Sequence, residues 1–185
     1  MQNHSNCLRL PAILCILTVL VSVACSAQTP LRALVSANSQ IQNETDCFSL
    51  GKWDEREACF ARQDDEQINL CEKSSPLACR PYKEMYFAEK KIIQTETEIQ
   101  KYSVVSYKNY LIDDPDYVND LDVFLRESGK AWASYRDSQC QLEPYINGIS
   151  RREFANCVEQ CRLERTLSRI VELQGLLATL KSNQE

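Results

Sequence analysis

The stretch that decides the fold is residues 81–110, PYKEMYFAEKKIIQTETEIQKYSVVSYKNY. Apolar side chains recur in it at steps of three and four residues, with lysines and glutamates between them. These positions are Tyr82, Met85, Tyr86, Ile92, Ile93, Ile99, Tyr102, Val105 and Tyr110. Such spacing places the apolar side chains on one face of a helix. The segment therefore predicts one long amphipathic helix.

The expected helix stops at residues 111–113, and Asp114-Pro115 predicts the start of another. The carboxylate of Asp114 can accept a hydrogen bond from an unpaired backbone amide, and proline at the first helical position loses no hydrogen bond. Asp116 and Asp120 then lie near the positive end of that helix.

Two further helices follow from the same periodicity. The first runs to about Leu142, where Pro144 and Asn147-Gly148 break it. Its expected inner face is Leu121, Phe124, Leu125, Ser128, Trp132, Tyr135 and Leu142. The last covers roughly residues 151–180 and carries Phe154, Val158, Cys161, Leu167, Ile170, Val171, Leu177 and Leu180. Because strand-like alternation is never sustained, we expect an all-α fold, a small disulfide-linked helical bundle with a central antiparallel hairpin.

The first residues have the features of a secretory signal peptide. Arg9 precedes an apolar run from Pro11 to Val23, and small residues follow it. The run is shorter than the roughly 20 residues that a membrane-spanning helix needs. Val21-Ser22-Val23-Ala24 before Cys25 resembles a bacterial lipobox, which predicts lipidation of Cys25; ordinary cleavage after Ala24 or Ala27 is the alternative. We expect a signal over 1–24, a tether over 25–46 and a single helical domain over 47–182.

Ten cysteines are present, of which Cys7 and Cys15 lie in the expected signal. Those after the tether are Cys47, Cys59, Cys71, Cys79, Cys140, Cys157 and Cys161. Such density in an exported chain indicates disulfides, and the absence of a C-x-x-C pair argues against a metal site. The first four can form two bonds in any arrangement. Cys140 can pair with either Cys157 or Cys161, which would leave one thiol buried, free or intermolecular.

Charge and composition limit the possible functions. The chain has 26 acidic and 21 basic residues, a net charge of −5, which suits a basic protein partner and disfavours nucleic acid. Its only histidine, His4, lies in the expected signal, so histidine-dependent catalysis is excluded from the exported chain. The four glycines are scattered and form no phosphate-binding loop. We expect no enzyme, no metal and no cofactor.

The aspartates around the second helix start have two interpretations. Asp113, Asp114, Asp116, Asp120 and Asp122 can cap and neutralise the end of a helix. They can also form an exposed negative loop that meets a cationic enzyme, with Asp113, Asp114, Asp116 and Asp120 as possible partner contacts.

The segment AWASYRDSQC at residues 131–140 has the pattern A-W-x-x-Y-R-D-x-x-C. A second pattern, C-x4-T-x2-R-x3-L, is present as Cys161, Thr166, Arg169 and Leu173. Together they resemble the LprI-type lysozyme-inhibitor domain over about residues 117–177. The spacing of Cys47 and Cys59 also resembles that family's amino-terminal cysteine pair. The resemblance implies that Cys140 pairs with Cys161 and not with Cys157.

The resemblance also implies roles for the motif residues and for the protein. We expect structural roles for Trp132, Tyr135, Arg136, Asp137, Thr166 and Arg169. The implied function is that of a periplasmic or outer-membrane lipoprotein that binds and inhibits a lysozyme or related peptidoglycan hydrolase. The alternatives are an immunity protein against a secreted toxin and a non-catalytic structural envelope adaptor, which a free thiol would favour because it could dimerise the chain.

Overall fold

The computed structural model describes residues 46–75 and 78–183, so the predicted signal, the tether and the possible lipidation at Cys25 lie outside the described residues. All of its elements are helical, which confirms the all-α fold class. They are η1 (Cys47–Ser49), α1 (Trp53–Ala61), α2 (Asp65–Ser74), α3 (Arg80–Ser106), η2 (Tyr110–Ile112), α4 (Tyr117–Ile146) and α5 (Phe154–Ser182). In this part of the chain no helix is both long and apolar enough to cross a membrane.

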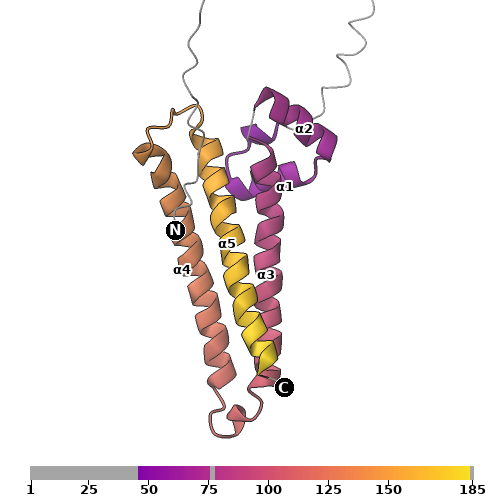
Figure 1. Cartoon of the computed structure of the whole chain (residues 1–185), viewed down its shortest axis with the longest axis vertical. Helices are drawn as coiled ribbons and strands as arrows, with labels where there is room; N and C mark the ends of the chain where they lie inside the picture. Colours follow the sequence, from indigo (N-terminus) through magenta and orange to yellow (C-terminus); the bar gives the residue numbers. More distant parts are fainter. Residues whose placement is uncertain (1–45, 76–77, 184–185) are drawn as a thin grey trace, which may run out of the picture. The chain divides into compact units, whose positions relative to one another are not determined.

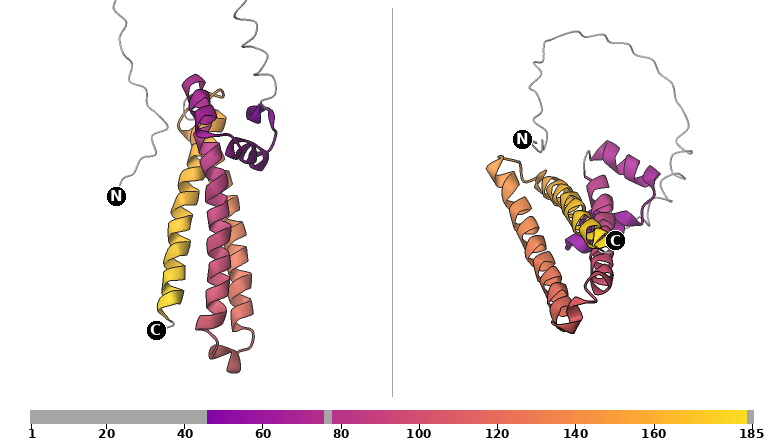
Figure 2. Two further views of the ribbon diagram at one scale, coloured as in Figure 1. Left: turned by 90° about the vertical axis from the view of Figure 1, so that its right-hand side faces the viewer. Right: turned by 60° about the horizontal axis from the view of Figure 1, so that its bottom comes forward.

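Three long helices, α3, α4 and α5, lie side by side and alternate in direction (Figures 1 and 2). The chain runs along α3, turns at η2, returns along α4 and turns again before α5. Consequently α5 is antiparallel to α4 and parallel to α3. α5 contacts both neighbours extensively, whereas α3 and α4 contact each other much less. The bundle therefore depends on α5.

The main core lies along the seam between α3 and α5. Met85 and Leu173 are completely buried there, and among the described residues Leu125 is the one buried residue that α4 contributes to this core. Its members are Met85, Ala88, Ile92, Ile99, Leu125, Leu163, Ile170, Leu173, Leu177 and Leu180. Each leucine or isoleucine buried this way stabilises the fold by about 1.5–3 kcal/mol.

A second core joins η1, α1 and α2 to the first turn of α3. The rings of Phe60 and Tyr82 stack with centroids 5.3 Å apart, and both side chains are buried beside Ile68. The structure has disulfides between Cys47 and Cys59 and between Cys71 and Cys79, a choice that the spacing alone left open. These bonds hold two short helices that have little core of their own.

The end of α3 and the exposure of some apolar residues on α3 and α5 differ from the prediction. α3 ends at Ser106 and η2 follows as a separate turn, so the predicted continuation to Tyr110 was wrong. Ile93 and Val105 are exposed because only one face of α3 meets α5, and Val171 is exposed on the far side of α5.

The largest correction concerns α4. Phe124, Tyr135 and Leu142 were expected on its inner face, but they are 67%, 59% and 49% exposed. The side chains of α4 that are buried are Leu125, Arg136, Cys140 and Pro144. Pro144 does not end the helix, which continues to Ile146. α4 thus turns a disulfide and a charged side chain toward α5 and keeps an apolar stripe on the outside.

Candidate functional site

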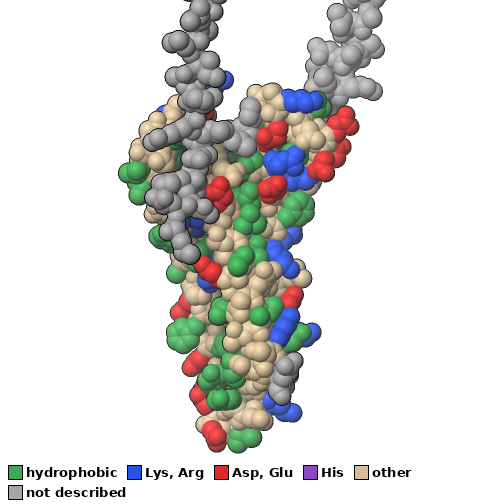
Figure 3. Space-filling model, viewed as in Figure 1, with side chains coloured by type: hydrophobic (Ala, Val, Ile, Leu, Met, Phe, Trp, Pro, Cys, Tyr) green, Lys and Arg blue, Asp and Glu red, His purple; other side chains and the backbone are tan. Residues whose placement is uncertain are grey.

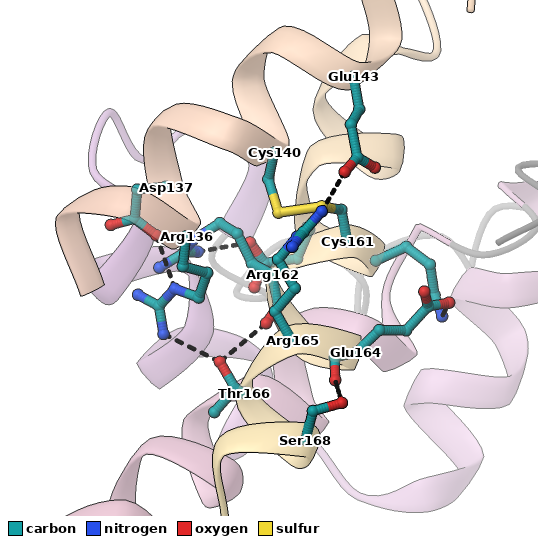
Figure 4. Close-up of a disulfide and its surroundings, with 12 residues drawn as sticks. Arg136, Asp137, Cys140, Glu143, Cys161, Arg162, Glu164, Arg165, Thr166 and Ser168 are labelled. Atoms are coloured by element: carbon teal, nitrogen blue, oxygen red, sulfur yellow. Dashed lines mark hydrogen bonds and ion pairs between the residues drawn. A yellow bond between two sulfur atoms is a disulfide. The ribbon is translucent and has the colours of Figure 1, made fainter. Parts of the chain in front are cut away.

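The motif residues of α4 and α5 meet around a disulfide. Cys140 and Cys161 are bonded with their Cα atoms 5.5 Å apart, and Cys140 is completely buried (Figure 4). Next to this bond, Arg165 of α5 pairs with Glu143 of α4. Cys157 is disulfide-bonded as well, so the hypothesis of a free thiol, which would have favoured the adaptor alternative, is wrong.

Arg136 is the buried cation of α4, with only 3% of its surface exposed. It donates from Nε to Asp137 Oδ1 at 2.8 Å and from Nη1 to Thr166 Oγ1 at 2.9 Å, and it also pairs with Glu89 of α3. Its guanidinium lies 4.9 Å from the centre of the Trp132 ring. One side chain therefore links α3, α4 and α5.

Arg162 is the corresponding cation of α5. Its Nε donates to Asp137 Oδ1 at 2.9 Å, and its Nη1 donates to Glu57 and Glu159, each at 2.6 Å. Its guanidinium also lies 5.2 Å from the centre of the Trp53 ring. Arg162 thus ties α1 to α5, and the shared Asp137 of α4 joins it to Arg136.

The carboxylates of this cluster have shifted pKa values in opposite directions. Burial raises the pKa of Glu159 to about 8; Arg162 opposes this rise, and the neighbouring Glu57 adds to it. Burial alone would also raise the pKa of Asp137, but hydrogen bonds from Arg136 and Arg162 lower it below its usual value. Glu159 therefore keeps its proton at neutral pH, which lowers the number of buried negative charges that Arg162 has to balance.

This cluster is suited to holding helices together. Its carboxylates are bound by arginines, and among residues 46–75 and 78–183 no group of histidine, cysteine, aspartate and glutamate side chains could hold a metal ion. Of the motif residues, Arg169 lies 5.9 Å from the Trp132 ring and joins the cluster's edge. Tyr135 points outward and does not take part.

Sequence reasoning missed Glu57 and Glu89 as members of the cluster, whereas the charge spacing of the last helix predicts pairing of Arg162 with Glu159. Arg162 and Glu159 are three residues apart on one helix, a spacing at which ion pairs form, so that pair was detectable. Glu57 is 105 residues away from Arg162, and no local pattern indicates their contact.

Besides the buried arginine cluster, the exposed turn between α3 and α4 is a second candidate site. Tyr107, Tyr110 and Tyr117 pack against one another with ring centroids 5.1–5.6 Å apart. The backbone amide of Asp114 donates to the Tyr110 carbonyl at 2.8 Å. At the end of this aromatic cluster Ile112 is 80% exposed. The turn is therefore ordered by its tyrosines while it presents an apolar side chain to solvent.

Four aspartates follow Ile112 in the sequence of this turn. Asp113, Asp114, Asp116 and Asp120 are all exposed, and none of them forms an ion pair within the part of the chain that the structure describes. The predicted cap was wrong: α4 begins at Tyr117, and Asp116 in the cap position makes no side-chain hydrogen bond to the helix. The reason is that residues 113–116 form a turn of their own, in which the Tyr117 amide bonds to the Asp114 carbonyl. We call residues 110–120 the acidic turn.

Fold and site together define a helical, disulfide-linked scaffold that presents an ordered acidic turn. The family model described as lysozyme inhibitor LprI matches residues 105–173, so this part of the chain is similar to that family. The match contains the acidic turn, the α4 motif and the Cys140–Cys161 bond. It confirms the resemblance to this family that the sequence motifs indicated. Neither the curated proteins nor the solved structures gave a match.

Proposed function

We propose that this protein is an exported, non-enzymatic inhibitor of a lysozyme or related peptidoglycan hydrolase, and that the acidic turn is its contact. The observation that carries the proposal is the family match, which names a lysozyme inhibitor and spans this turn. The buried cluster would then be the scaffold that positions the turn, because its charged groups are used within the fold.

Charge supports this assignment. Residues 107–122 contain five aspartates and one lysine, in a chain whose net charge is −5. Lysozymes are basic proteins, so opposite charges would speed encounter and make binding sensitive to salt. The tyrosine cluster adds a second advantage. A turn already ordered before binding loses less conformational entropy in the complex.

The proposed location is the periplasm or the outer membrane, with attachment through a lipid on Cys25 if the predicted lipobox is processed. This follows from the signal-like first residues and agrees with an inhibitor of cell-wall hydrolases. An immunity protein against a secreted toxin remains the alternative in the same compartment.

The test is a titration of the full exported protein, with its disulfides formed, against chicken-type and goose-type lysozymes, following muramidase activity at low and high salt. We expect stoichiometric inhibition that weakens with salt. Changing Asp113, Asp116 and Asp120 together to asparagine should weaken inhibition by roughly tenfold at low salt and much less at high salt.

A matched control removes three negative charges elsewhere. Asp54, Glu66 and Glu84 are exposed on α1, α2 and α3, and their amide variants change the net charge equally. The control should inhibit nearly as well as the unchanged protein. Equal loss in both triple variants would mean that only net charge matters, and no inhibition by the unchanged protein would refute the proposal.

A further inference from the structure

The outward face of α4 carries a regular stripe of exposed side chains. Its members are Phe124, Ser128, Ala131, Tyr135, Ser138, Leu142 and Tyr145. They follow one another at alternating steps of four and three residues, which is the spacing of a coiled-coil seam. All seven are exposed, and the stripe extends over about 30 Å at the rise of an α-helix. We call it the α4 stripe.

The charged residues of this part of α4 avoid the stripe. Between Ala131 and Ile146 the charged side chains are Arg136, Asp137 and Glu143, and all three are bound to α5. Arg126, Glu127 and Lys130 are exposed only beside the first part of the stripe, so the stretch from Ala131 to Ile146 presents an uncharged face in a chain with 25% charged residues. Figure 3 shows hydrophobic side chains at intervals along the edge that α4 occupies in Figure 1.

We propose that a second copy of this chain covers the α4 stripe, with the two α4 helices antiparallel about a twofold axis. In an antiparallel coiled coil the two seam positions alternate across the axis. With the twofold axis near residue 133, the stripe residues pair across the interface. Phe124 then lies against Leu142 of the partner subunit, and Ala131 lies against Tyr135 of the partner subunit. Ser128 then meets Ser138 of the partner subunit. Large side chains face each other at both ends, and small ones let the helices approach in the middle.

Charge complementarity selects this orientation over the parallel one. Arg151 and Arg152 are exposed in the turn after α4, and the aspartates of the acidic turn are exposed before it. In the antiparallel arrangement the end of α4 that is followed by Arg151 and Arg152 lies near the end of the second α4 that is preceded by Asp114 and Asp116 of the partner subunit, so opposite charges face each other. A parallel pair would instead place aspartates beside aspartates and arginines beside arginines, which is repulsive.

The experiment is sedimentation velocity of the full exported protein with its disulfides formed, over a wide concentration range. We expect a monomer–dimer equilibrium. The variants Phe124→Glu and Leu142→Glu place a charge in the stripe and should raise the dimer dissociation constant by at least about tenfold. Val171→Glu is the control, because Val171 is 68% exposed on α5, away from α4. It should leave the constant unchanged, and circular dichroism should show all three variants folded.

Orientation is tested separately by charge reversal. Replacing Arg151 and Arg152 with glutamate should weaken the dimer, and adding Asp114→Lys and Asp116→Lys in the same chain should restore it. A protein that is monomeric at every concentration would overturn the proposal, as would a dimer that the stripe variants leave intact. If Asp114→Lys and Asp116→Lys did not restore the dimer, the antiparallel orientation would be refuted. These readouts do not depend on whether the protein inhibits a hydrolase.

Discussion

Glu159 should make the stability of this protein depend on pH near neutrality. Its pKa is about 8 in the folded state, against an ordinary glutamate value of 4.5, because its side chain is buried. The folded protein therefore holds a proton that the unfolded chain has released. The stabilisation from Glu159 is fully present below pH 4.5 and is lost as pH rises through about 8.

The size of the effect follows from the shift. Each pH unit in which only the folded state holds the proton changes the free energy of unfolding by about 1.36 kcal/mol. Between pH 6 and pH 8 this amounts to about 2 kcal/mol, since the proton is half lost at the upper limit. With a urea dependence of about 2 kcal/mol per molar, the midpoint of unfolding should fall by about 1 M.

The assay is urea unfolding, followed by circular dichroism at pH 6, 7 and 8, of the unchanged protein and of Glu159→Gln. Glutamine keeps the shape of a protonated glutamate and an oxygen that accepts from Arg162, but it cannot titrate. The variant should lose most of the pH dependence, whereas the exposed control Glu84→Gln should retain it. Asp137 does not interfere, because its lowered pKa places its loss of stability at acidic pH. Identical slopes in the unchanged protein and Glu159→Gln would refute the assignment of the proton to this carboxyl.

Three further predictions concern stability and are checked by thermal and urea unfolding. Replacing Cys140 and Cys161 together with serine should cost about 3 kcal/mol, because their bond closes a loop with a sequence separation of 21; an unchanged melting temperature would contradict a stabilising role for the bond. Leu173→Ala should cost about 2–5 kcal/mol, since Leu173 is completely buried in the α3–α5 seam, and Val171→Ala on the exposed side should cost far less. Arg136→Ala should cost about 1.5–3 kcal/mol, because it removes charge-assisted hydrogen bonds to half-buried Asp137 and Glu89 and one to the buried Thr166, and a loss no larger than that of Val171→Ala would show that the cluster is not needed.

The helices themselves could be predicted because their apolar positions repeat every three or four residues. The error on α4 has a specific physical cause. This helix carries two faces with apolar residues at helical spacing, one around Leu125 and Cys140 and the other containing Phe124 and Leu142. Periodicity identifies such faces but does not tell which one meets the rest of the chain. The disulfide and Arg136 decided it in favour of the less apolar face.

The buried cluster was beyond sequence reasoning for a different reason. Charged residues are normally solvated, so Glu57 and Arg162 look like surface positions until the fold brings α1 beside α5. The motif residues that the LprI resemblance marked as structural do gather there, with the exception of Tyr135. A family pattern indicates which residues matter together, whereas the charges that balance them come from distant helices.

The two proposals make competing demands on the acidic turn. A second copy would engage Asp114 and Asp116 through arginines, and a hydrolase would use the same exposed aspartates. Binding of one would then oppose binding of the other by an equal factor, as linkage requires. Phe124→Glu, which removes the dimer without touching these aspartates, should inhibit lysozyme at lower concentration than the unchanged protein, because a larger fraction is competent to bind. Weaker inhibition by Phe124→Glu would instead place the hydrolase contact on the α4 stripe itself.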